Sequence, residues 1–295
     1  MTPLLVTIPH TGTDVPPQIL ARWTDAAKAL PDTDWHLAPL YDFVPRIGAG
    51  LLVARYSRYV IDLNRPADGH ALYPGRDETA RVPTSTFEQA DIYLPEQLPS
   101  ADEIAERTER YWRPWHDEVR RQLALRKARF GFAVLFDAHS IRSEVPRFFS
   151  GRLPGLMLGT ADGHSCDPQM AQAALDVFEA SPFSWALNAP FKGGHITRSF
   201  GAPVDGVHAL QLEMSQRLYM DEDPPFQYNP SKADVLKPWL ERALQAILAT
   251  LPALKSASAP GQVGAAPGSA GRVARIACRA RSSHGFRTSA FDGLY

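Results

Sequence analysis

The sequence has few cysteines, no long apolar run and almost no net charge. Each of these absences excludes a class of protein. Only Cys166 and Cys278 occur among the 295 residues, so we expect no disulfide framework and a reducing cytoplasm as the compartment. No run of about 18 apolar residues occurs, so we expect no membrane span and no membrane partner. The first residues lack a basic stretch followed by an apolar one, so we expect no secretory signal.

The net charge of −1 is unevenly distributed along the chain. Residues 255–295 carry one lysine and five arginines against one aspartate, which leaves the rest of the chain at −6. A mildly acidic body argues against binding of nucleic acid. The segment 253–295 is rich in Ala, Gly, Ser and Pro and has no periodic apolar face, so it cannot bury enough apolar area to offset its ordering entropy. We therefore predict a folded domain over 1–252 and a disordered basic tail over 253–295. The tail either has no fixed role or contacts nucleic acid or an acidic partner.

Short apolar runs alternate with helical patterns within the domain. The pattern predicts an α/β fold with a mixed, largely parallel sheet. The expected strands are 4–9, 51–64 (two strands or one bent strand), 132–139, 155–160, 184–189 and 208–215.

Capping residues place the helices between these strands. Ser100 and Glu103 form a capping box before an apolar stripe that Pro114 should kink, and Asp167 with Pro168 opens another helix. A last helix, over about 231–251, presents one apolar stripe, made of Val235, Trp239, Leu240, Ala243, Leu244, Ile247 and Leu251.

Ionisable residues lie at the ends of three predicted strands. His10 follows the first strand, Asp137 and His139 end another in "FDAHS", and Glu213 lies in "HALQLEMS". In open α/β sheets ligands bind beyond the carboxyl ends of the strands, so these side chains are expected to converge. Asp137 and His139 share a face, so one can ligate a metal while the other orients it. Imidazoles suit zinc and similar divalent ions, although any single histidine is more often a surface or capping residue.

Two further acidic positions have competing interpretations. One aspartate of "DTDW" (Asp32 or Asp34) is a candidate oxygen ligand or the N-cap of the next helix. Glu213 lies in a run so apolar that its carboxylate is costly unless it is paired or functional. It is either an outward-facing edge residue or the general base that deprotonates a water.

Arginines cluster near the same segments, and guanidinium groups bind carboxylates bidentately, which favours an acidic substrate. The candidates are Arg58, Arg65, Arg142, Arg147 and Arg198. The segment 188–198, "NAPFKGGHITR", is predicted to be a loop close to a ligand, with a plain turn as the alternative. Cys166 before a helix N-terminus is a weaker candidate, as a nucleophile with a lowered thiol pKa.

Several of these strings together resemble the N-formylglutamate amidohydrolase (N-formylglutamate deformylase) family over roughly residues 3–250. They are "IPHTG", "DTDWH", "YSRYVIDLNRP", "DAHSIRS", "LGTADGHSCDP", "NAPFKGG" and "ALQLEMSQRLYMDE". The resemblance implies hydrolysis of N-formyl-L-glutamate to formate and L-glutamate, the last hydrolytic step of a histidine-degradation route. It also implies a three-layer α/β/α sandwich like that of the zinc-carboxypeptidase and aspartoacylase group.

The resemblance also implies a set of site residues. His10 and His139 would be histidine ligands of a divalent metal, most simply Zn²⁺, and Glu213 the base. The wider group has a glutamate three residues after its first histidine, where this chain has Thr13, so Asp34 is our choice of acidic ligand, with Asp137 or Asp32 as alternatives. The substrate would contact Asn64, Arg65, Arg142, Arg198, Asn188 and Gly193. The expected partner is a small-molecule substrate, and the sequence indicates no oligomeric state. A hydrolase of another N-acylated acidic amino acid and a non-catalytic binding protein for an acidic metabolite stay open.

Overall fold

The computed structural model describes residues 1–72, 75 and 77–257. The chain divides into two units, Met1–Ala259 and Pro260–Tyr295, and the elements below belong to the first. The last helix runs to Ala257, five residues past the predicted domain boundary, and the rest of the predicted tail, from 258 on, lies outside the described residues.

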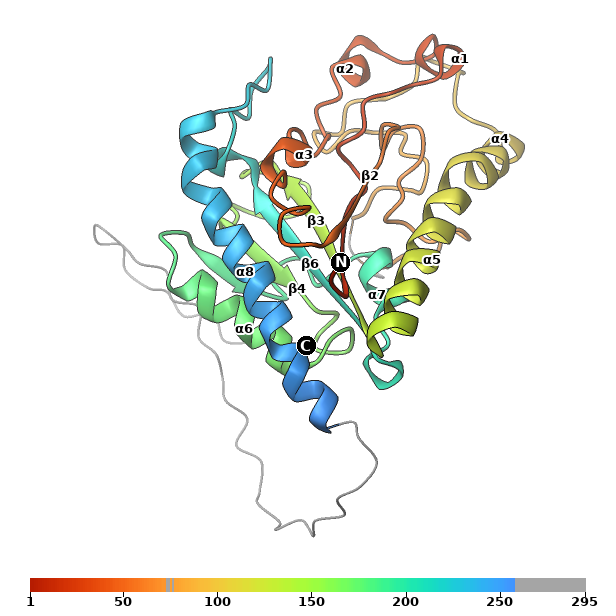
Figure 1. Ribbon diagram of the computed structural model, residues 1–295. Helices are drawn as coiled ribbons and strands as arrows, with labels where there is room; N and C mark the ends of the chain where they lie inside the picture. Colours follow the sequence, from red (N-terminus) through yellow and green to blue (C-terminus); the bar gives the residue numbers. More distant parts are fainter. Residues whose placement is uncertain (73–74, 76, 258–295) are drawn as a thin grey trace. The chain divides into compact units, whose positions relative to one another are not determined.

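Six strands form one mixed sheet in the order β2-β1-β3-β6-β4-β5 (Figure 1). The pairs β1–β2, β1–β3, β3–β6 and β4–β5 are parallel, and β4 runs antiparallel to β6. The expected mixed, largely parallel sheet is therefore confirmed. The strands are β1 (Leu4–Ile8), β2 (Gly50–Val53), β3 (Ala133–Ile141), β4 (Leu156–Gly159), β5 (Trp185–Leu187) and β6 (Val207–Ser215).

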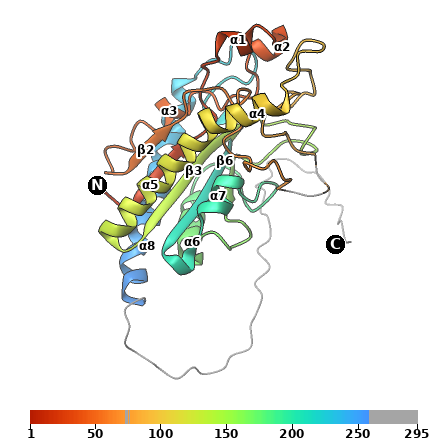
Figure 2. The same cartoon turned by 90° about the vertical axis from the view of Figure 1, so that its right-hand side faces the viewer.

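Helices cover both faces of this sheet (Figures 1 and 2). Alternate residues of each strand point to opposite faces: Leu4 and Val6 join a core with α6 (Pro168–Glu179) and α8 (Pro230–Ala257), while Leu5 joins a second core with α5 (Arg113–Phe130). The remaining helices are α1 (Pro17–Leu20), α2 (Asp25–Lys28), α3 (Leu37–Leu40), α4 (Ala101–Arg107) and α7 (His195–Phe200), with the short 3₁₀ turns η2 (Pro203–Asp205) and η3 (Gln216–Leu218). The likeness to the zinc-carboxypeptidase and aspartoacylase group stays a prediction.

The predicted caps explain where two helices begin. The Ser100 hydroxyl accepts a hydrogen bond from the Glu103 amide at the start of α4, and the Asp167 carboxylate accepts one from the Gln169 amide at the start of α6. The kink expected at Pro114 takes the form of a π-helical segment, η1 (Thr108–Trp112), which joins α4 to α5 just before the proline. A residue without an amide hydrogen interrupts the α-helical ladder there.

Two predictions about the elements were wrong. Of the predicted strand region 51–64, only 51–53 belongs to a strand of the sheet, β2. The chain then leaves the sheet and turns, with the Val60 amide bonded to the Ser57 carbonyl. Val235, which the sequence places in the apolar stripe of the last helix, is 53% exposed. Leu236 is buried in that stripe instead.

The topology brings the carboxyl ends of three strands together at one end of the sheet. Strands β1, β3 and β6 are adjacent and parallel, so their carboxyl ends lie side by side. His139 is paired with Glu213 in the β3–β6 register, and His10 lies two residues beyond the end of β1. Within the described residues, no helix is long and apolar enough to cross a membrane.

Candidate active site

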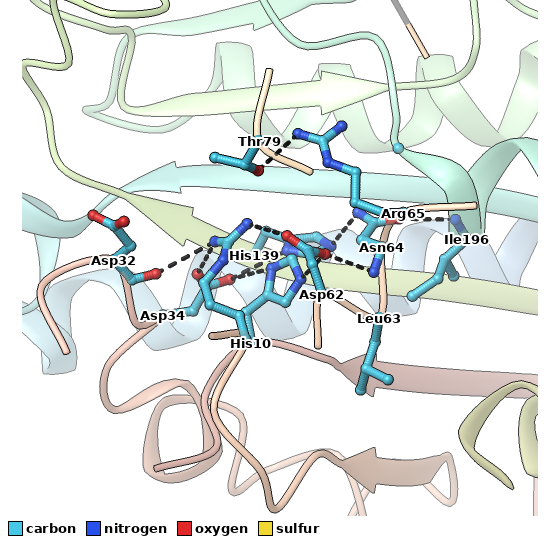
Figure 3. Close-up of polar contacts among 12 residues, drawn as sticks. His10, Asp32, Asp34, Asp62, Leu63, Asn64, Arg65, Thr79, His139 and Ile196 are labelled. Atoms are coloured by element: carbon cyan, nitrogen blue, oxygen red, sulfur yellow. Dashed lines mark hydrogen bonds and ion pairs between the residues drawn. The ribbon is translucent and has the colours of Figure 1, made fainter. Parts of the chain in front are cut away.

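Three buried side chains converge at the edge where β1, β3 and β6 end (Figure 3). His10, Asp34 and His139 each offer one ligand atom, and these atoms lie within 4.8 Å of one another. The two imidazole centroids are 4.8 Å apart. Two nitrogens and a carboxylate oxygen at this spacing could hold a metal ion.

A carboxylate on the far side fixes the orientation of His10. Asp62 Oδ1 lies 2.8 Å from His10 Nε2, and Asp62 Oδ2 accepts a hydrogen bond from Arg58 at 2.7 Å. With the Nε2 hydrogen donated to Asp62, Nδ1 keeps its lone pair and faces Asp34 at 3.9 Å. Such a carboxylate–imidazole pair is the usual support of a metal-ligating histidine.

His139 has the same arrangement. Asp137 Oδ2 lies 2.8 Å from His139 Nε2, and His139 Nδ1 lies 3.2 Å from Asp34 Oδ2. Asp137 Oδ1 accepts a hydrogen bond from the Thr7 hydroxyl at 2.7 Å. The pattern "DAH" therefore places the aspartate and histidine on one face, with Asp137 positioned to orient the imidazole while Asp34 lies between the two histidines.

One carboxylate oxygen of Asp34 has no hydrogen-bond partner among the described residues. Asp34 Oδ2 accepts a hydrogen bond from the Ser140 amide, whereas Oδ1 is the buried oxygen without such a partner in the described part of the chain. The nearest charged group to Oδ1 is Arg58 Nη1, at 3.6 Å. A buried carboxylate oxygen without a hydrogen bond is costly, and a bound cation would offset that cost. The residues present therefore fit a divalent metal.

The charges of this cluster call for a cation. Burial alone would lower the pKa of His139, but Asp137 and Asp34 offset that effect and raise the pKa well above its ordinary value. Burial likewise opposes ionisation of Asp62, yet His10 and Arg58 hold its pKa well below the ordinary range. Burial and Arg58 lower the pKa of His10, so the carboxylates favour positive charge at His139 but not at His10. A metal ion would supply positive charge to the cluster without protonation of His10.

Glu213 lies beside the ligands and opens onto a cavity. Burial raises its pKa to about 8, against the opposing effect of His139. A carboxyl whose affinity for a proton is raised to near neutral pH can accept a proton and return it, as general acid–base catalysis requires. The interpretation of Glu213 as an outward-facing edge residue was wrong, since β6 is an interior strand.

Asn64 connects the ligand cluster to the loop before α7. Its Oδ1 accepts a hydrogen bond from the Ile196 amide at 2.8 Å, and its Nδ2 lies 3.1 Å from His139 Nε2. Gly194 packs so closely that a Cβ there would lie 2.3 Å from Asn64 Nδ2. Gln211 Oε1 in turn accepts a hydrogen bond from the Gly194 amide. The glycine is thus required by this close approach.

The cavity beside the ligands has a volume of about 380 Å³, within the range of small-molecule sites. Its wall includes His10, Asp34, His139, Glu213, Asn64, Arg58, Arg65, Arg147, Asp77, Glu78, Phe148, Phe191 and Gly194. Asn64 and Arg65 are among the residues that the sequence predicts for substrate binding. The wall also has Arg58 and Arg147, which the sequence indicates only as members of the arginine cluster.

Four predicted substrate contacts do not line this cavity. Arg142 pairs with Glu88 and Asp223, because the chain turns outward after β3 ends at Ile141. Asn188 hydrogen-bonds Thr160, and Arg198 donates to the Gly193 carbonyl. The loop 188–194 does reach the cavity, through Pro190, Phe191 and Gly194 in place of Asn188 and Gly193.

Asp32 and Cys166 do not fit the roles that the sequence suggests for them. Asp32, a possible ligand, accepts hydrogen bonds from the Tyr59 hydroxyl and the Phe87 amide and stands outside the ligand cluster. Neither aspartate of "DTDW" caps α3, whose N-cap is His36, without a side-chain hydrogen bond. Cys166 is buried, and burial raises its thiol pKa to about 12, so the expected lowering was wrong.

Comparison with known proteins gives consistent matches. The family model described as N-formylglutamate amidohydrolase matches residues 2–220. The chain is 46% identical over 248 residues to an N-formylglutamate deformylase of Pseudomonas aeruginosa, covering 84% of this chain and 93% of that protein. It is 44% identical to an N-formylglutamate deformylase of Pseudomonas putida, with 84% and 92% covered. A crystal structure of an N-formylglutamate amidohydrolase from Ralstonia eutropha superposes with a TM-score of 0.72 at 25% identity, covering 87% of this chain and 95% of that one.

Proposed function

The chain belongs to the N-formylglutamate amidohydrolase family, and from that premise we propose that it hydrolyses N-formyl-L-glutamate to formate and L-glutamate, as a step of histidine degradation. The observation that carries the proposal is the convergence of His10, Asp34 and His139 beside Glu213 on the wall of one cavity. A water-activating centre next to a substrate-sized space is what hydrolysis of a linear amide needs.

In this proposal His10, Asp34 and His139 would hold a divalent cation. Zinc suits this donor set of two imidazoles and one carboxylate. When bound, it would supply a Lewis acid that polarises the formyl oxygen and lowers the pKa of water. Asp62 and Asp137 would accept the Nε2 hydrogens of the two imidazoles, which would leave both Nδ1 atoms available to a metal.

Glu213 carries the proton in the reaction. It accepts a proton from the attacking water as the water oxygen adds to the formyl carbon. The carbon–nitrogen bond then breaks, and Glu213 returns the proton to the departing amine nitrogen of glutamate. The formyl carbon leaves as formate with the water oxygen. One carboxyl group is thus base and then acid.

The substrate end of the cavity carries guanidinium donors, with Arg65 beside Asn64 on its wall and Glu78 paired with Arg65. A formyl group offers little surface to recognise, so selectivity should come from the two carboxylates of the glutamate part. Arg65 and Asn64 remain the proposed substrate contacts, because both face the cavity that Glu213 faces.

The test combines elemental analysis with a product assay. Purified protein is expected to contain about one zinc per chain and to release formate from N-formyl-L-glutamate. Treatment with a chelator should abolish formate release, and added zinc should restore it. Release of acetate from N-acetyl-L-glutamate or succinate from N-succinyl-L-glutamate at a higher kcat/KM would refute the assignment of the formyl substrate. Absence of any hydrolysis by the zinc-loaded protein would refute the enzymatic proposal.

A further inference from the structure

We propose that Arg65 and Arg147 form a two-point receptor for a dicarboxylate, and that Asp77 and Glu78 occupy this receptor as internal competitors until the ligand displaces them. The proposal rests on the proposed function, because that function supplies a substrate with two carboxylates. All four side chains line the same cavity as the candidate metal ligands.

Asp77 binds Arg147 in the geometry that a substrate carboxylate would use. Its Oδ2 accepts from Arg147 Nε at 2.8 Å, and its Oδ1 accepts from Nη2 at 3.0 Å, which makes two parallel bonds to one guanidinium. Arg147 Nη1 donates separately to the Ser85 hydroxyl and the Thr86 carbonyl. The guanidinium is therefore anchored independently of Asp77, and its Nε and Nη2 donors would remain in place if Asp77 moved away.

Glu78 holds Arg65 less completely. Glu78 Oε2 accepts from Arg65 Nη1 at 3.0 Å, and Thr79 accepts from Nη2 at 3.2 Å, as Figure 3 shows for Arg65 and Thr79. Arg65 Nε is buried and has no hydrogen-bond partner within the described residues. A buried guanidinium nitrogen without an acceptor is costly. A ligand carboxylate that took Nε together with Nη2, the nitrogen bonded to Thr79, would satisfy it, and Glu78 would oppose that ligand by its charge and by its own pairing with the guanidinium.

The two internal carboxylates differ in how easily they can leave. The Asp77 side chain is 48% exposed, so water would solvate it after release. Glu78 is more enclosed and also accepts a hydrogen bond from the Leu72 amide at 3.0 Å. Exchange at Arg147 should therefore be the easier of the two. In both cases one carboxylate replaces another, so the charge on each guanidinium stays balanced.

This exchange favours ligands that have two carboxylates. A ligand with one carboxylate can displace only one internal acid, and an uncharged formyl amide can displace neither. A dicarboxylate recovers both ion pairs in full. The internal acids therefore lower the affinity for any ligand that uses the arginines, and only a ligand with two carboxylates can pair with both guanidiniums at once.

The test uses Asp77→Asn and Glu78→Gln, each of which removes one negative charge with little change in shape. Calorimetric binding of glutarate, a dicarboxylate without an amide, reports on the receptor alone. Asp77→Asn is expected to lower the Kd for glutarate about fivefold, the upper end for a partly exposed ion pair. The KM for N-formylglutamate should fall similarly, and Glu78→Gln should act in the same direction.

Two controls separate this effect from a general loss of negative charge. Glu144→Gln removes the partner of Arg152 in an exposed ion pair away from the cavity wall, and it should leave the Kd for glutarate unchanged. In an Arg147→Met background, which should weaken binding at least about tenfold, adding Asp77→Asn should no longer tighten it.

A Kd that rises or stays constant in Asp77→Asn and Glu78→Gln would overturn the proposal, because the acids would then position the arginines and not compete. An equal tightening in Glu144→Gln would also overturn it. The glutarate measurement does not depend on turnover. If Asp77→Asn tightens glutarate binding while the zinc-loaded wild type releases no formate, the hydrolytic function fails and the receptor stands.

Discussion

Replacing Asp62 by asparagine should weaken metal binding far more than the same change at Asp137. Asp62 is buried and accepts from three groups: His10 Nε2 at 2.8 Å, the Asn64 amide at 2.8 Å and Arg58 Nη2 at 2.7 Å. An asparagine there has one acceptor oxygen and one donor nitrogen. If the oxygen faces His10, the nitrogen faces Arg58, and two donors oppose each other. If the nitrogen faces His10, it favours the tautomer with hydrogen on Nδ1, which cannot bind a cation.

The hydrogen-bond partners of the two aspartates determine how much the loss of metal affinity differs between Asp62→Asn and Asp137→Asn. Loss of a carboxylate that orients a ligating histidine typically costs 10- to 100-fold in metal affinity, which is about 1.4 to 2.8 kcal/mol. At Asp137 the second neighbour is the Thr7 hydroxyl, which can both donate and accept. An asparagine at 137 can therefore keep its oxygen towards His139 and give its nitrogen hydrogen to Thr7. Asp137→Asn should lose only about threefold, from the weaker basicity of the imidazole.

The assay is a competition titration of metal-free protein against a chromophoric zinc chelator, with Asp137→Asn as the matched control for Asp62→Asn. Thermal unfolding of each metal-free variant checks that both still fold. Equal losses of zinc affinity in the two variants, or a larger loss at Asp137, would refute the reasoning from donor and acceptor counts.

Three further outcomes follow from the same geometry. Glu213→Gln should keep zinc binding and lower kcat for formate release about 10²- to 10⁴-fold, and a near-wild-type kcat would rule out the base. Saturating the metal-free protein with zinc at 100 times its Kd should raise the free energy of unfolding by about 2.7 kcal/mol; no rise in Tm on calorimetry would speak against a site in the folded state. Burial lowers the pKa of His116 from 6.5 to about 3, so the unfolded chain binds the extra proton first, and stability should fall as the pH drops from 6.5 towards 3. His116→Gln keeps a donor for the Leu63 carbonyl and should show a shallower fall in urea denaturation between pH 6.5 and pH 4, whereas an unchanged slope would contradict the assignment to His116.

The strands that carry the site could be predicted because their sequences are simple. β1, β3 and β6 are apolar runs buried on both faces, and such runs are typical of interior parallel strands. Because these strands are parallel, His10, His139 and Glu213 can be placed at one end of the sheet from the strand order alone. No information on side-chain contacts is needed for that prediction. The family resemblance added the roles, and the two histidines and the glutamate lie where the sequence placed them.

The parts of the site that lie in loops could not be predicted in the same way. Asp34 could not be separated from a helix cap, because only the fold shows that it faces both Nδ1 atoms. Residues 54–64 were expected to be strand, so the turn that brings Asp62 behind His10 had no signal. Arg142 and Arg147 both follow β3, one and six residues after its end at Ile141. Only the direction of the chain after Ile141 decides that Arg147 reaches the cavity and Arg142 does not.

The three candidate ligands come from parts of the chain that differ in their anchorage. His139 belongs to a strand with hydrogen-bonded neighbours on both sides, whereas His10 and Asp34 lie in segments outside the sheet. A cation among them would act as a cross-link that pins the first connecting segment, 9–36, to the centre of the sheet. The segment also packs its own apolar residues, with Trp23 buried against Tyr59. Loss of the ion would therefore loosen the link between this segment and the sheet while the segment's own core stays packed.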